Sequence, residues 1–415
     1  MKDSGVPWIG EIPNNWEKSS MKYIGSYING YAFKPDDWSS KGLPIIRIQD
    51  LTGSNEDPNY YEGQLNLKYL IKPNDILISW AATLDAFVWK GPEGWLNQHI
   101  FKALPNNVLV TTGFFLWLVK IGMLNMNNEN KHGIVMQHVT AAVFNNFRVP
   151  LPPKQEQQRI ADFLDAKCAE IDSILEKTRA SIEEYKKLKQ SVITEAVTRG
   201  IRGERSMKMT ESVWFSEIPS TWGFKRLKYQ FRIEKRIAGE TGHTVLAITQ
   251  KGIIPKKMDY GNGGQFAEDY SNYQLVYPGD FAMNHMDLLT GWVDISRFNG
   301  VTSPDYRVFT LIDRTTNFPA YYLYFMQMCY MDTIFYGMGA GVSGMGRWRL
   351  QADKFLNFFI PVPPYEEQQE IAAYLDEKCA AIDTLIASKE ALITELESYK
   401  KSLVYEYVTG KKEVV

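Results

Sequence analysis

Residues 150–158 read Pro-Leu-Pro-Pro-Lys-Gln-Glu-Gln-Gln, and residues 361–369 read Pro-Val-Pro-Pro-Tyr-Glu-Glu-Gln-Gln. The likeness continues without a gap over residues 150–198 and 361–409, where 23 of 49 positions are identical. A match of this length within one chain indicates an internal duplication, and a duplication decides the architecture of the whole fold. We therefore predict two units, each made of one domain and one copy of the repeated segment.

Fainter likenesses support the same division. Residues 8–16 resemble residues 214–222, with tryptophan at both ends of each stretch, and residues 70–75 resemble residues 275–280. We expect a first domain over residues 1–149, a first long helix over 150–202, a second domain over 203–360 and a second long helix over 361–415. In this scheme the helices stayed alike while the domains diverged.

Each repeated segment is predicted to be one long helix. Its Pro-x-Pro-Pro start favours extended backbone, so a strand should end there and a helix begin just after. Apolar residues then recur at steps of three and four, as in Ile160, Leu164, Cys168, Ile171 and Leu175. This spacing is typical of a coiled-coil seam. Gly200 and Gly410 follow the two patterns as plausible C-terminal caps.

Such helices, roughly 66 Å long at about 44 residues, cannot bury an apolar stripe alone. We expect them to pair in an antiparallel coiled coil; the alternative is two separate helices, each packed on its own domain. Antiparallel pairing predicts that Cys168 lies beside a residue close to Glu395, and that Cys168 and Cys379 are too far apart for a disulfide.

The two domains are predicted to be mixed α/β, so the fold class is α+β with a pseudo-two-fold duplication. Short apolar runs at residues 45–48, 76–80 and 306–311 are typical of strands. Residues 114–123 and 320–331 are predicted to form buried helices. The surface loops between them are rich in polar and aromatic residues.

Composition excludes several classes of protein. An apolar fraction of 45% and a charged fraction of 23% are those of a globular protein. The N-terminus lacks a signal-peptide pattern and no window approaches ~18 uncharged apolar residues, so we expect a cytoplasmic protein without membrane contact. Three cysteines without paired spacing predict neither a disulfide framework nor a metal site, and we expect no cofactor.

Charge at first argues against a nucleic-acid binder, because the net charge is −2. Much of the acidity, however, lies in residues 361–415, which carry 6 basic and 11 acidic residues. Any affinity for DNA must therefore come from local basic patches. Arg347 and Arg349 follow a glycine-rich run at 337–346, where backbone can come close to a phosphate.

Candidate DNA contacts are side chains that can pair with base edges or phosphates. They are Lys34, Arg47, Asn97, Gln98, His99, Lys131, His132, Gln137 and His138 in the first domain, and Lys235, Arg236, Lys251, Lys256, Lys257, Asn284, Arg347 and Arg349 in the second. Residues 131–138 and 337–349 form two matched loops, each shortly before a long helix.

Enzymatic interpretations find little support. Residues 339–344 fit the pattern GxGxxG, but the strand, helix and later acidic residue of a dinucleotide site are missing around them. No Walker loop, methyltransferase tetrad or acidic cluster of a metal nuclease is present. We therefore expect no catalytic residues and no metal ligands in this chain.

Two variable domains, each followed by a Pro-x-Pro-Pro…Gln-Gln…Ile-Ala…Leu-Asp helix, resemble the specificity subunit of type I restriction-modification enzymes over essentially the full length. Residues 30–34, 97–101 and 303–306 are similar to recurring elements of that family's target-recognition domains. The resemblance implies a non-catalytic subunit that reads a split, asymmetric site in double-stranded DNA. It also implies binding of two methylation subunits, which carry S-adenosylmethionine, and through them of restriction subunits, with the helix pair fixing the unread gap.

Two other classes stay open on the residues alone. A stand-alone transcription regulator predicts tight DNA binding by the isolated chain and a ligand pocket. A structural coiled-coil adaptor predicts no affinity for DNA.

Overall fold

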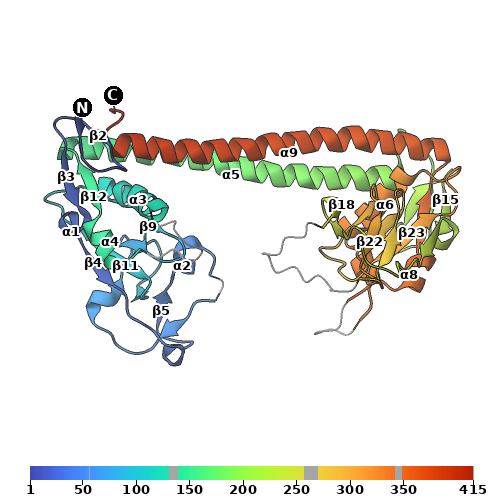
Figure 1. The fold of residues 1–415 in the computed structure, drawn as a ribbon, viewed down its shortest axis with the longest axis horizontal. Helices are drawn as coiled ribbons and strands as arrows, with labels where there is room; N and C mark the ends of the chain where they lie inside the picture. Colours follow the sequence, from blue (N-terminus) through green and yellow to red (C-terminus); the bar gives the residue numbers. More distant parts are fainter. Residues whose placement is uncertain (56, 130–138, 257–269, 342–347, 415) are drawn as a thin grey trace. The chain divides into compact units, whose positions relative to one another are not determined.

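The computed structural model describes residues 1–55, 57–129, 139–256, 270–341 and 348–414 (Figure 1). The chain divides into two compact units. Unit 1 consists of residues 1–179 and 390–415, and unit 2 consists of residues 180–389. Each unit therefore contains one domain, the first part of one long helix and the last part of the other.

The domain of unit 1 is a mixed α/β fold. Its elements are β1 (Lys2–Asp3), β2 (Glu11–Ile12), β3 (Glu17–Ser20), α1 (Met21–Ile24), β4 (Gly25–Asn29), η1 (Pro35–Asp37), β5 (Leu43–Ile46), α2 (Ile48–Thr52), β6 (Tyr60–Tyr61), η2 (Leu67–Tyr69), β7 (Leu70–Ile71), β8 (Ile76–Ser79), β9 (Asp85–Val88), β10 (Gly94–Leu96), β11 (Ile100–Pro105), α3 (Thr112–Glu129), α4 (Ala141–Asn146) and β12 (Arg148–Leu151). The long helix α5 (Lys154–Arg199) follows.

The domain of unit 2 has the same plan. Its elements are β13 (Met207–Met209), β14 (Glu217–Pro219), β15 (Gly223–Arg226), η3 (Leu227–Tyr229), β16 (Phe231–Glu234), β17 (Leu246–Thr249), β18 (Gly252–Pro255), β19 (Gln274–Val276), β20 (Phe281–Met283), β21 (Val293–Ile295), β22 (Gly300–Thr302), β23 (Arg307–Leu311), α6 (Pro319–Met331), α7 (Ile334–Met338), α8 (Ala352–Asn357) and β24 (Phe359–Val362). The long helix α9 (Tyr365–Val408) follows.

The central sheets show that the duplication extends to the domain fold. The order is β4-β11-β8-β9 in unit 1 and β16-β23-β20-β21 in unit 2, and every neighbouring pair is antiparallel. In both units, the strand just before the long helix pairs with an early strand, as β12 with β3 and β24 with β15. Two domains of different sequence thus share one topology.

The faint likeness between residues 70–75 and 275–280 has a clear structural cause. In each stretch an aspartate side chain accepts a hydrogen bond from the backbone N–H of the residue three positions earlier and so closes a turn. Lys72 N–H donates to Asp75 (2.7 Å), and Tyr277 N–H donates to Asp280 (2.9 Å). The residue before the aspartate has positive φ, 74° at Asn74 and 89° at Gly279. Asparagine and glycine tolerate this conformation best, so the turn preserved its residue types.

One expected strand lies two residues earlier than predicted. The strand expected at residues 45–48 covers Leu43–Ile46, and Ile48 begins the helix α2. The backbone N–H of Arg47 donates to Asp50 (2.7 Å), a side-chain cap that starts a helix there. The run Ile-Ile-Arg-Ile hides this boundary, because the boundary is set by an aspartate three residues after Arg47.

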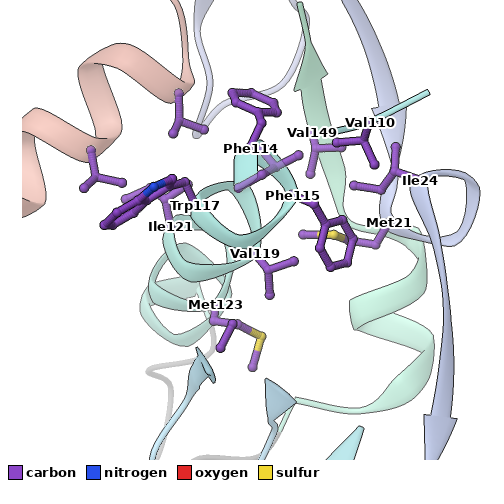
Figure 2. Packing of buried hydrophobic residues seen from close by; sticks show 14 of the residues in the cluster. Met21, Ile24, Val110, Phe114, Phe115, Trp117, Val119, Ile121, Met123 and Val149 are labelled. Atoms are coloured by element: carbon purple, nitrogen blue, oxygen red, sulfur yellow. The ribbon is translucent and has the colours of Figure 1, made fainter. Parts of the chain in front are cut away.

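The core of unit 1 is built around α3. Phe114, Phe115 and Val119 are fully buried on this helix, and Figure 2 shows Phe115 beside Met21 while Trp117 and Ile121 lie on the opposite side of the α3 ribbon. The indole N–H of Trp117 donates to Asp165 of α5 (2.8 Å). In unit 2, the hydroxyl of Tyr324 on α6 donates to Asp376 of α9 (2.7 Å). The same helix-to-helix contact therefore occurs twice.

The long helices are antiparallel, as predicted. Within unit 1 Lys400 of α9 pairs with Asp172 of α5 (2.6 Å), and within unit 2 Lys189 of α5 pairs with Asp383 of α9 (2.7 Å). Asp172 and Asp383 are equivalent positions of the repeat, and so are Lys189 and Lys400. The aspartate of each helix therefore pairs with the equivalent lysine of the other helix, so the same contact occurs twice, as in a two-fold interface. In Figure 1 the two helices run side by side in each unit.

The predicted glycine caps are present, and the thiols are free. Gly200 and Gly410 follow the two helices with φ of 80° and 73°, the left-handed conformation of a C-terminal cap. Cys168 is buried in the core of unit 1 and Cys379 in the core of unit 2, and neither is in a disulfide.

The predicted partner of Cys168 was wrong. The ion pair between Asp172 and Lys400 brings Cys168 level with Val404, nine positions from Glu395, and both Cys168 and Val404 belong to the core of unit 1. The prediction assumed that the repeats pair along their whole length. In fact the first two turns of each helix bind its own domain instead of the other helix.

Two equivalent glutamines make that attachment. Gln157 is fully buried; its Oε1 accepts from Thr111 N–H (2.8 Å), and its Nε2 donates to the carbonyls of Leu109 (3.0 Å) and Pro152 (2.8 Å). Gln368 repeats the arrangement, accepting from Phe318 N–H (2.7 Å) and donating to Thr316 O (3.3 Å) and Pro363 O (2.9 Å). One side chain thus joins the helix start to the segment before α3 or α6.

We predict that Gln157→Leu lowers the free energy of unfolding of unit 1 by roughly 1–3 kcal/mol, because one buried and two partly buried backbone groups lose their hydrogen-bond partner. Gln158→Leu changes an exposed neighbour bonded only to Asp162 and should cost less than about 0.5 kcal/mol. Gln368→Leu and Gln369→Leu form the equivalent pair in unit 2. Urea unfolding followed by tryptophan fluorescence measures the effect, and equal losses in a matched pair would contradict this attachment.

Candidate nucleic-acid interface

In unit 2, polar groups collect where β20 ends. The side-chain oxygen of Asn284 accepts backbone N–H groups of Met286 and Asp287 (both 3.2 Å), and its carbonyl accepts from the Tyr330 hydroxyl (2.7 Å). Asn284, a predicted DNA contact, therefore shapes the turn after the strand. The side-chain N–H₂ of Asn284 is the group that could donate a hydrogen bond to a base.

The segment after the glycine-rich run is attached to the same strand end. Leu350 N–H donates to His285 O (3.0 Å), and Arg307 on β23 donates to Leu350 O (2.8 Å). Ala340 and Arg349 form an antiparallel bridge with bonds of 3.0 and 3.2 Å. Arg349 therefore stands at the base of a loop that is held at both ends, with its side chain exposed.

A second turn lies beside this strand end. Gln250, in the turn between β17 and β18, donates to the carbonyl of Thr290 (3.4 Å), which brings exposed Lys251 near the loop after β20. These loops border an open groove of about 1030 Å³, which is also lined by Lys186 and Lys189 of α5. The lining also includes Asp376 and Asp383, and Asp383 pairs with Lys189, so Lys251 and Gln250 are the groove residues that could meet a phosphate backbone.

Arg307 and His285 give this end of the domain unusual electrostatics. Arg307 is 5% exposed, lies over the Phe355 ring (4.8 Å), and has no carboxylate within ion-pair distance among the residues that the structure describes. Burial lowers the pKa of Arg307 to about 10. Burial, followed by the charges of Arg307 and Arg349, lowers the pKa of His285 to about 4, so His285 is neutral at neutral pH.

Unit 1 has a corresponding strand end with different side chains. Val139 N–H donates to Trp80 O (3.1 Å) just after β8, as Leu350 does to His285 after β20. The His99 ring packs against Trp80, with centroids 5.4 Å apart. Gln98 Oε1 and His99 Nδ1 are buried and have no hydrogen-bond partner among the residues that the structure describes. An unpaired buried polar atom is costly, and it is expected where a ligand supplies the missing partner.

Other predicted contacts occupy varied places. Lys34 and Arg47 precede the short helices η1 and α2, and Arg47 stacks on Trp38 (4.6 Å). Asn97 is buried, and its side chain accepts from His99 N–H (3.3 Å). Lys235 and Lys256 are exposed. Lys131, His132, Gln137, His138, Lys257 and Arg347 lie outside the described residues.

Arg236 is engaged within the protein. It forms a two-pronged pair with Asp280 (2.7 and 3.2 Å) and lies over the Tyr277 ring (4.9 Å). Such a pair occupies part of the guanidinium, so Arg236 has a structural contact within the protein and its contact with DNA stays a prediction. Arg307 and Trp80 also lie at these strand ends, but each lies within or directly after an apolar strand pattern, which gives no sign of a polar role.

Within the described part of the chain, no histidine, cysteine, aspartate and glutamate side chains cluster as metal ligands. The described helices also include none with the length and apolar character needed to cross a bilayer.

Fold and site together define a duplicated protein in which two domains of one topology present different polar surfaces. Residues 13–184 and 245–398 match the family described as type I restriction modification DNA specificity domain. The chain therefore belongs to this family. It is a specificity subunit, and such subunits are the non-catalytic recognition components of restriction-modification systems.

Individual relatives are distant but cover the chain. The EcoBI specificity subunit of Escherichia coli is 21% identical, over 99% of this chain and 89% of the relative. The MjaVIII specificity subunit of Methanocaldococcus jannaschii is 25% identical, over 97% and 94%. A solved chain from a study of complex assembly and conformational transition of the type I R-M system has a TM-score of 0.69 at 14% identity, covering 97% of this chain and 100% of that one. The HsdS subunit of Thermoanaerobacter tengcongensis scores 0.51 at 16% identity, covering 97% and 98%.

We predict that Arg349→Ala weakens binding of the cognate DNA by ~1–3 kcal/mol if the side chain reads a guanine, and flattens the salt dependence if it meets only phosphate. Arg297→Ala is the matched control, because exposed Arg297 follows β21 at the opposite end of β20. Fluorescence anisotropy titrations at several salt concentrations separate the two modes. Unchanged affinity and salt slope in Arg349→Ala would place the loop elsewhere.

A second prediction follows from neutral His285. Its pKa of about 4 in the folded protein lies below the ordinary histidine pKa of 6.5, so the unfolded state binds a proton more readily between these pH values. Unit 2 should therefore lose stability as pH falls from 6.5 to 4, by up to about 3 kcal/mol from this residue. His285→Phe should flatten that part of the profile, whereas the same change at half-buried His243 should not. Denaturant unfolding at stepwise pH tests both variants.

Proposed function

We propose that this chain reads a split, asymmetric sequence in double-stranded DNA, one half with each domain. The observation that carries the proposal is the contrast at the two strand ends. Trp80, Gln98 and His99 lie near the end of β8, whereas Asn284, Arg349 and the buried Arg307 lie near the end of β20. Sequence is read through donors and acceptors on such side chains, so one scaffold with two different surfaces suits two different half-sites.

The chain acts with partners in this proposal. It docks two methylation subunits, which carry S-adenosylmethionine, and through them restriction subunits, all in the cytoplasm. The paired helices hold the two readers at a fixed separation and thereby set the unread gap, since half-site spacing follows from protein geometry. The chain itself takes no cofactor.

A gel-shift of the purified full chain, with and without the methylation subunit, tests the proposal. We expect specific binding that strengthens when the methylation subunit is added. Tight specific binding by the chain alone, unaffected by the methylation subunit, points to a transcription regulator. No DNA binding under either condition points to a structural adaptor, and either result contradicts the proposal.

We also predict that specificity is modular. Replacing residues 1–149 with another recognition domain of the family should change one half of the methylated sequence and retain the other, because the sheet of each domain is closed within its own unit. Sequencing of modified bases in cells that carry the hybrid measures this. A simultaneous change in both halves would overturn the assignment of one half-site to each domain.

A further inference from the structure

The two copies of the long helix are alike in sequence but differ in charge. Residues 151–202 carry 10 basic and 9 acidic residues, whereas residues 361–415 carry 6 basic and 11 acidic residues. The difference includes positions at which the two helices meet. Charged residues along the edges of a helix pair set which partner a helix accepts, so these positions bear on the choice of partner.

One ion pair between the helices shows the difference directly. In unit 1, Arg179 of α5 pairs with Glu397 of α9 (2.6 Å). The residue of α9 equivalent to Arg179 is Glu390, and the residue of α5 equivalent to Glu397 is Lys186. At both positions of the repeat, α5 therefore carries the cation and α9 carries the anion.

The pairs that fix the direction of the helices have the opposite property. Asp172 pairs with Lys400, and Lys189 pairs with Asp383. Each helix carries one aspartate and one lysine at these equivalent positions. A second copy of α5 in the place of α9 would therefore present Lys189 to Asp172, which is again an attractive pair. These contacts select the direction of the helices but not the partner.

The register shows what two like helices would bring together. Two copies of α5 would set Arg179 of each against Lys186 of the other. Two copies of α9 would set Glu390 of each against Glu397 of the other. Both arrangements bring like charges together twice, and like charges repel. Lys186 also pairs with Glu183 of its own helix (2.8 Å), which weakens the first repulsion but leaves the second.

A second contact, just beyond the end of α5, acts in the same sense. In unit 2, Arg202 forms a two-pronged pair with Glu370 of α9 (2.9 and 2.8 Å). The residue of α5 equivalent to Glu370 is Arg159. Two copies of the first half would therefore set Arg202 of each against Arg159 of the other. A two-pronged pair is among the stronger contacts of an arginine, so its replacement by a repulsion adds to the rejection.

We propose that α5 and α9 each accept the other as partner and reject a second copy of themselves. Every pair of two first halves would leave two second halves without an unlike partner, so rejection of either like pair prevents both. Such specificity depends on repulsion in the wrong complex as well as on attraction in the right one. A chain cut between the two copies therefore reassembles with one domain of each kind on every helix pair.

A chain that is cut after folding tests this selectivity. Gly203 is exposed, and a side chain added there would meet nothing within 4 Å. A protease site inserted at this position yields the complete protein as two halves. Unfolding in urea followed by dialysis lets the halves choose their partners, and native mass spectrometry separates like from unlike pairs by mass. We expect unlike pairs alone from the wild-type sequence.

The variant Arg179→Glu/Glu397→Arg exchanges the charges of the ion pair and so retains the native attraction. In like pairs, however, the new glutamate would face Lys186 and the new arginine would face Glu390. The ratio of like to unlike pairs should rise at least about tenfold, because four facing contacts change from repulsive to attractive. Adding Arg159→Glu, which gives Arg202 a carboxylate in a like pair, should raise the ratio further.

The matched control is Asp172→Lys/Lys400→Asp, which also exchanges the charges of one native ion pair. In like pairs this change would set two lysines or two aspartates against each other, so unlike pairs should remain alone. In the uncut chain, both exchanges should keep the urea midpoint of the wild type. Arg179→Glu by itself should lower that midpoint, because it faces Glu397 with a like charge.

Four outcomes would overturn the proposal. They are like pairs from the wild-type halves in the proportions of free choice, failure of those halves to form unlike pairs, absence of like pairs from Arg179→Glu/Glu397→Arg while its unlike pairs form, and an unchanged urea midpoint in Arg179→Glu. None of these measurements involves DNA, so the proposed function is tested separately.

Discussion

The structure depends on the pairing of two like helices in opposite directions. Burial of Ile171, Leu175, Ile182 and Ile382 favours pairing but is non-directional. Charge selects the direction. In a parallel pair of the repeats, Asp172 would face Asp383 and Lys189 would face Lys400, whereas the antiparallel pair joins each aspartate to a lysine. Exposed ion pairs contribute little to stability, yet the difference between two attractive and two repulsive pairs suffices to choose one arrangement.

Each domain is attached to the paired helices by one set of residues, and its candidate recognition surface is made of a different set. Gln157 and Gln368 bind the segments before α3 and α6, and Asp165 and Asp376 bind Trp117 and Tyr324. The candidate recognition groups stand at the ends of β8 and β20. Because attachment and recognition use different residues, the domains could diverge in what they present without loosening from the helices. This separation is the physical basis on which we propose two independent readers.

The duplicated helices, their glycine caps and their antiparallel pairing could be predicted, because a seven-residue apolar pattern and a repeat are strong local signals. The register could not, since it depends on how many turns bind the domain. Site residues were harder still. Arg236 and Asn284 have the right chemistry, but Asp280 and a turn occupy them, and only folding brings those partners together. Arg307 lies in a buried strand, where sequence pattern predicts packing rather than charge.

A net charge of −2 becomes compatible with DNA binding once the places of the cations are known. At the start of β8, Asp75 neutralises Lys102 (2.5 Å), and at the start of β20, Asp280 neutralises Arg236. At the far end of β20, Arg307 has no carboxylate partner among the described residues, and Arg349 stands beside it. At this end of the sheet, Arg349 is therefore an exposed cation and Arg307 a buried one. Under the proposed function, exposed cations such as Arg349 supply phosphate contacts, and base contacts carry the discrimination between sequences.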